Sequence, residues 1–86
     1  MASKNTIIEA IKNKIGSTQY EIWRIGLTND PKKRKEDWKN PGYWTQWDAD
    51  SLSDAQDIET FFIRKGMKGG TGGDLSAQST TYVYVF

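Results

Sequence analysis

The chain has 86 residues, a formal net charge of +1, no cysteine and no histidine. Its length fits one domain, residues 1–86, and leaves no room for two independent cores. The missing residue types exclude disulfides, the common zinc sites and Cys or His nucleophiles, so any metal would be a hard cation bound by oxygen. No apolar run approaches the ~20 residues of a membrane span, and the first residues lack a signal-peptide core. These features favour a soluble, cytoplasmic protein with no membrane partner.

Charge is distributed unevenly along the chain. Residues 1–42 contain nine Lys/Arg and five Asp/Glu, a balance of +4, whereas residues 43–86 contain three and six, a balance of −3. A basic half can bind phosphate even when the whole chain is nearly neutral. A solvated surface of mixed charge explains the same pattern equally well.

The N-terminal segment, residues 1–19, is expected to form a helix and a turn. Isoleucines recur every four residues from Ile7 to Ile15, which predicts a helix over residues 6–15 with one apolar stripe. Thr6 and Glu9 fit a capping box, and Gly16 is typical of a helix end.

Residues 20–28 are predicted to form a strand, because the segment is rich in aromatic and β-branched residues. Alternation gives it one apolar face and one mixed face. The apolar face, expected to point to the core, contains Trp23, Ile25 and Leu27. The mixed face includes Arg24, Gly26 and Thr28 and is expected to line a groove.

The remaining segments alternate in the same way. Asp30 and Pro31 predict the start of a helix that runs to Trp38, with an unusual cationic first turn. A short strand over residues 43–47 and a helix over residues 51–65, with a capping box at Ser53 and Gln56, are expected next. Residues 66–79 contain most of the glycines and are predicted to be a loop, and residues 80–86 a strand paired within a sheet. The predicted fold is α+β, a small three-stranded antiparallel sheet flanked by three helices.

The segment from Arg24 to Arg34 places several phosphate-binding groups close together. Gly26 allows a ligand or another part of the chain to approach the strand closely. Arg34 has a planar guanidinium suited to phosphate oxygens, and Thr28 and the free N–H groups at the helix start add donors. A plain strand–helix turn with a solvated basic helix explains these residues too, and physical grounds alone favour that interpretation.

The same residues resemble the GIY-YIG nuclease domain. That family has a "YIG" motif on a strand, a Thr two residues after the Gly, and an Arg eight residues after it; Gly26, Thr28 and Arg34 match these positions. The family's Glu lies on its next long helix, and Glu59 occupies the similar position here. The resemblance covers roughly residues 20–65. It implies that Arg34 contacts the scissile phosphate and that Glu59 binds a divalent cation, magnesium.

The sequence also departs from the family pattern. Arg24 occupies the position of the "YIG" tyrosine, and a helix is expected where the family has its first, "GIY" strand. If the order of strands is permuted, the C-terminal strand takes the place of that first strand, and Tyr82 or Tyr84 lies beside Arg24. The resemblance then implies a catalytic role for Tyr84. Ordinary packing of these tyrosines in the sheet is the competing interpretation.

The sequence leaves two functions open. The first is a GIY-YIG-like domain that binds DNA or another nucleic acid and cleaves DNA with magnesium through Arg34, Glu59 and Tyr84. The alternative is a non-catalytic binding or adaptor module that kept the fold and lost the chemistry. The residues predicted to bind nucleic acid are Arg24, Gly26, Thr28, Lys32, Lys33, Lys35 and Trp38. The remaining aromatic residues near residues 43–47 either stack on unpaired bases or pack in the core.

Overall fold

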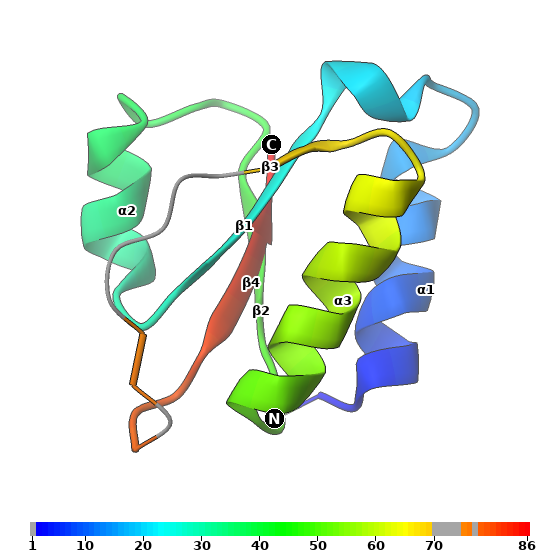
Figure 1. The fold of residues 1–86 in the computed structure, drawn as a ribbon. Helices are drawn as coiled ribbons and strands as arrows, with labels where there is room; N and C mark the ends of the chain where they lie inside the picture. Colours follow the sequence, from blue (N-terminus) through cyan, green and yellow to red (C-terminus); the bar gives the residue numbers. More distant parts are fainter. Residues whose placement is uncertain (1, 70–74, 77) are drawn as a thin grey trace.

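The computed structural model describes residues 2–69, 75, 76 and 78–86, and its fold is α+β as predicted (Figure 1). Three helices are present in this part of the chain, together with a sheet of four strands. In chain order the elements are α1 (Lys4–Ile15), a short 3-10 helix (Tyr20–Ile22), β1 (Arg24–Thr28), α2 (Pro31–Asp37), β2 (Thr45–Asp48), α3 (Leu52–Arg64), β3 (Lys68–Gly69) and β4 (Tyr82–Val85).

The sheet has the order β2-β4-β1-β3 and is mixed. The C-terminal strand β4 lies between β2 and β1 and is antiparallel to both, which confirms that the last strand pairs inside a sheet. The prediction of three antiparallel strands was wrong, because Lys68 and Gly69 pair with β1 in parallel. Met67 is buried in the core after α3 and holds the following residues against the edge of β1, where the Lys68 N–H donates to the Trp23 carbonyl (3.0 Å). The rest of the expected loop includes residues 70–74 and 77, which lie outside the described residues.

Helix caps explain where the helices begin. The α2 helix starts as predicted, with the Asp30 carboxylate accepting from the Lys33 N–H at 3.1 Å. The other two caps were wrongly predicted: α1 is capped by Ser3 and α3 by Ser51, whose hydroxyl accepts from the Asp54 N–H at 3.0 Å. Each of these serines precedes its helix in extended conformation, which lets the hydroxyl reach an unpaired N–H of the first turn.

Residues 20–22 form a 3-10 turn rather than the start of a strand. The Trp23 N–H donates to the Tyr20 carbonyl at 3.0 Å, which closes the turn, and β1 begins only at Arg24. Likewise β2 begins at Thr45 and not at Tyr43. At both places the aromatic residues favoured a strand in the prediction, whereas the backbone forms a local turn.

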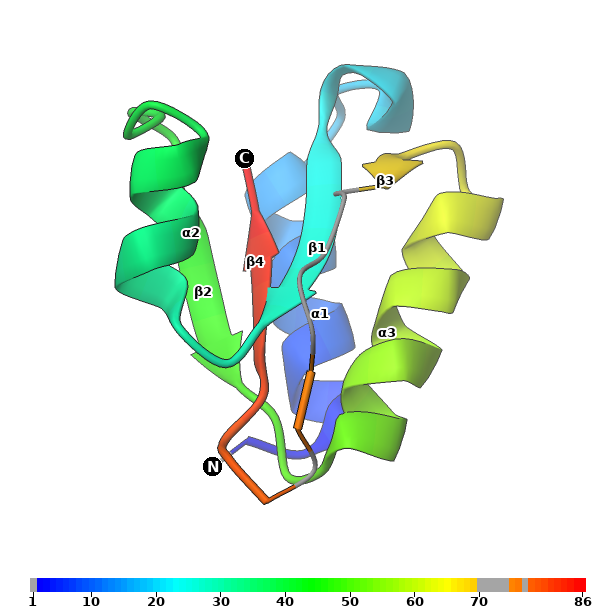
Figure 2. The same cartoon turned by 60° about the vertical axis from the view of Figure 1, so that its left-hand side comes forward.

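The two faces of the sheet are covered by different helices. Helices α1 and α3 pack on one face, where the core is apolar and fully buried, while α2 lies on the other side of the sheet (Figures 1 and 2). Ile25 and Leu27 of β1 point into the core as predicted, and Trp23 packs at its border. Within the described residues, no helix combines the length and apolarity that a bilayer crossing requires.

Candidate functional site

The mixed face of the sheet brings Gly26 and Tyr84 together. The two residues are partners in the antiparallel pairing of β1 with β4, so their side-chain positions share one face. The Tyr84 ring crosses directly over Gly26, and a Cβ built at Gly26 would clash with the Tyr84 ring and hydroxyl. The close approach that the sequence assigned to a ligand or to another part of the chain is therefore made by the protein's own tyrosine.

Aromatic residues enclose Tyr84. Trp44 stacks on its ring with centroids 4.4 Å apart and an interplanar angle of 8°, and the Trp38 indole N–H donates to its hydroxyl at 3.2 Å. Phe86 lies beside both tryptophans, with centroids 5.3 Å from Trp38 and 5.5 Å from Trp44. Tyr84 has no exposed surface in this arrangement. We call Trp38, Trp44, Tyr84 and Phe86 the aromatic cluster.

The pKa of Tyr84 is affected by three of the charged residues that were predicted to form the site. Burial raises the pKa of the Tyr84 hydroxyl; the hydrogen bond from Trp38 and the charges of Arg34 and Arg24 lower the pKa, and the charge of Glu59 raises it. Because the pKa is raised overall, Tyr84 is protonated at neutral pH and is a poor general base. In the structure the Tyr84 ring is packed and its hydroxyl accepts a hydrogen bond.

Arg24 is held on this face by two contacts. Its guanidinium lies over the Trp38 ring, 4.7 Å from the centroid, and it donates a hydrogen bond to the Gly69 carbonyl at 2.7 Å. A guanidinium stacked on an indole keeps its charge and some of its donors available for an anion. Arg24 therefore lies next to the aromatic cluster as a fixed cation.

Arg34 and Glu59 come from helices on opposite faces of the sheet, yet both influence Tyr84. Helix α3 runs beside β1, and Glu59 follows the core residue Ile58 on it, at a half-buried position. Burial raises the pKa of the Glu59 carboxyl. No hydrogen bond or ion pair joins Glu59 to another described residue. Its carboxylate is partly desolvated by burial, and a bound cation would stabilise the charged form.

The metal expectation rests on this one carboxylate. Among the described residues there is no group of three or more side chains of the kinds that hold metal ions. Magnesium is commonly held by one or two carboxylates together with substrate phosphates and water. The residues present therefore fit magnesium only in the company of a phosphate-bearing substrate.

Thr28 and Asn29 have structural partners at the end of β1. The Thr28 hydroxyl is buried and accepts from the Asp30 N–H at 3.0 Å. The Asn29 amide donates to the Thr80 carbonyl (3.0 Å) and accepts from the Ser76 N–H (2.7 Å). These bonds hold the segment before β4 against the start of α2. Thr28 and Asn29 therefore fix the position of the neighbouring elements.

The cations of α2 differ in exposure. Lys32 and Lys33 are exposed, whereas Arg34, Lys35 and the neighbouring Trp38 are partly buried. Elsewhere on the described surface Lys4 pairs with Asp57 and Lys12 with Glu9, and neither of these ion pairs involves a lysine of α2.

Sequence reasoning missed the part that Phe86 plays. Its ring completes the aromatic cluster, and its backbone exchanges two hydrogen bonds with Arg24. Aromatic residues alternate with valines in the last strand, which places the aromatic residues on one face, but nothing local identifies the neighbours of that face.

Comparison with protein-family models, with curated proteins and with solved structures gave no match for this chain.

Proposed function

We propose that this chain is a nucleic-acid-binding domain that contacts the phosphate backbone through α2. The surface consists of Lys32, Lys33 and Lys35, and we call it the α2 surface. Arg24 and Arg34 extend it toward the aromatic cluster. The observation that carries the proposal is the position of Lys32 and Lys33 in the first turn of α2, where the positive end of the helix dipole disfavours cations. Charges kept at such a place without an acidic partner among the described side chains are matched to an external anion.

The salt dependence of binding tests this proposal. Each phosphate contact on duplex DNA adds about 0.9 to the slope of log affinity against log salt. The double variant Lys32→Ala/Lys33→Ala should therefore lower the slope by about 2, measured by fluorescence anisotropy with a labelled duplex at several salt concentrations.

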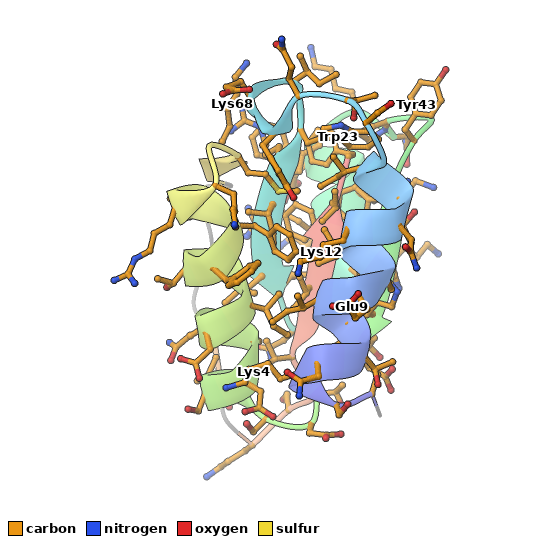
Figure 3. All side chains as sticks on the ribbon, turned by 90° about the vertical axis from the view of Figure 1, so that its right-hand side faces the viewer. Lys4, Glu9, Lys12, Trp23, Tyr43 and Lys68 are labelled. Carbon is orange, nitrogen blue, oxygen red and sulfur yellow. The ribbon has the colours of Figure 1, made fainter. Side chains whose placement is uncertain are left out.

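A matched variant removes two charges elsewhere. Lys4→Ala/Lys12→Ala lies on α1, in the layer on the other side of the sheet, and should leave both affinity and slope near those of the parent protein (Figure 3). Equal losses in the two double variants would show general attraction to a charged protein rather than a site on α2. Binding that does not change with salt would contradict the proposal altogether.

A second function, magnesium-dependent cleavage of DNA, is favoured by Arg34 and Glu59, whose charges both act on Tyr84. In this proposal the chain is a permuted, divergent relative of the GIY-YIG nucleases. Support comes from β4, which lies next to β1 as the permuted order requires. Arg34 would bind the phosphate and Glu59 would hold magnesium, which supplies charge neutralisation at the reacting phosphate.

Plasmid nicking separates the enzyme from the non-catalytic module. Magnesium-dependent nicking that both Arg34→Ala and Glu59→Ala abolish supports cleavage by this site. If nicking persists in both variants, it comes from a contaminant. Salt-dependent binding without nicking supports the non-catalytic module, and the absence of both activities leaves an adaptor that recognises protein.

A further inference from the structure

An apolar pocket of about 240 Å³ opens at the end of the sheet where the chain terminates. It is lined by Ile22, Trp23, Tyr43 and Phe86. Two of these side chains are unusually exposed for large apolar residues, Ile22 by 66% and Tyr43 by 79%. Figure 3 shows Trp23 and Tyr43 at the same end of the molecule. Exposed apolar side chains that line one pocket are typical of an interaction site.

One cation lies against a lining residue of this pocket, and a second lies on the neighbouring aromatic cluster. The Lys14 ammonium is 5.3 Å from the centroid of the Trp23 ring. On the other side Phe86 contacts Trp38, and Trp38 carries the Arg24 guanidinium on its face. The pocket is thus continuous, through Phe86, with the aromatic cluster and the cation beside it. Its charge complements an apolar ring attached to an anionic backbone.

We propose that this pocket binds one unpaired nucleobase of a nucleic-acid strand whose phosphates lie along Arg24 and α2. The inference rests on the proposed nucleic-acid binding and adds a preference for single-stranded or splayed substrates. The pocket is smaller than the 300 Å³ or more typical of sites for drug-sized ligands, which suits a single ring system. Its aromatic walls supply the stacking surface that single-strand-binding proteins use for bases of any sequence.

Tyr43 is the residue to change, because it is the most exposed wall of the pocket. Tyr43→Ala should weaken binding to a single-stranded oligonucleotide by about 5- to 150-fold, the range that stacking of one base provides. Binding to a blunt duplex should not change, since its bases are already stacked. Tyr43→Phe keeps the ring and should retain the affinity of the parent protein. Ile63→Ala, at another exposed apolar side chain on α3, serves as the matched control.

The probe is an oligonucleotide with 2-aminopurine in place of one base, whose fluorescence changes when the base stacks on an aromatic residue. If Tyr43→Ala binds the single strand as tightly as the parent protein and with the same salt slope, base binding in the pocket is refuted and the proposed α2 surface is unaffected. A parent protein that binds neither form of nucleic acid overturns both proposals. Sedimentation analysis tests whether a second copy of this chain occupies the pocket instead. A parent protein that dimerises, and a Tyr43→Ala variant that is monomeric with unchanged nucleic-acid affinity, would refute base binding.

Discussion

Replacing Gly26 with alanine tests how tightly the mixed face of the sheet is packed. The new Cβ would clash with the Tyr84 ring, and that ring has nowhere to move, because Trp44 stacks on it and Trp38 bonds its hydroxyl. Overpacking of this kind costs about 1–3 kcal/mol, and the enclosed ring places Gly26→Ala near the upper limit. For a domain of this size, ~3 kcal/mol lowers the melting temperature by about 12–24 °C. Alanine is no worse than glycine within a strand, so the loss would come from the clash.

The assay is urea unfolding followed by tryptophan fluorescence, with a double-mutant cycle to identify the cause. Tyr84→Leu removes the ring, and in that background Gly26→Ala should cost less than about 1 kcal/mol. Gly42→Ala is the matched control, since nothing lies within 4 Å of a Cβ there, and its effect should stay within about 0.5 kcal/mol. The packing argument is refuted if Gly26→Ala costs the same with and without the Tyr84 ring.

Two further predictions concern α3. Ser51→Ala removes the helix cap and should lower the free energy of unfolding by about 1 kcal/mol. Ser53→Ala, inside the helix, should change it by less than about 0.5 kcal/mol. Equal effects of the two variants in chemical denaturation would contradict the assigned cap. Burial raises the pKa of Glu59, so this carboxyl favours the folded state below its ordinary pKa of 4.5 and loses that contribution as the pH rises through its folded-state pKa. Glu59→Gln should therefore be more stable than the parent protein at pH 7 and equally stable at pH 3, and a difference that grows toward low pH would contradict the sign.

Local features of the fold were predictable from the sequence because neighbouring residues decide them. The start of α2 follows from an acidic cap and a proline one residue later, and both act within a single turn. The end of α1 at Gly16 follows from its positive φ of 58°, a conformation that glycine adopts without steric cost. The caps of α1 and α3 were harder, because several serines and threonines near each helix start compete for the same role. Extended backbone at Ser3 and Ser51 selects them, and that conformation depends on packing beyond the helix.

The sheet required information that no local pattern contains. Lys68 and Gly69 have weak strand propensity, and they pair with β1 only because α3 ends beside that edge and Met67 anchors the turn. Similarly, the C-terminal strand is predicted from its alternation, but its position between β2 and β1 is a property of the whole chain. The presence of β1, β2 and β4 was therefore predictable here, whereas the presence of β3 and the order of the four strands were not.

Gly26 shows why site prediction from sequence is harder than fold prediction. A glycine within a strand indicates that something approaches the backbone closely, but the pattern is the same whether that group belongs to a ligand or to the protein. Here the approaching group is Tyr84, far away in the sequence, and it fills the space that a substrate would need. In the proposed nucleic-acid binding, a strand would therefore meet the rim of the aromatic cluster and not its centre. Its first phosphate contacts would be with Arg24 and with the helix that carries Arg34, and the exposed pocket beside Phe86, rather than Tyr84, would be the accessible aromatic surface.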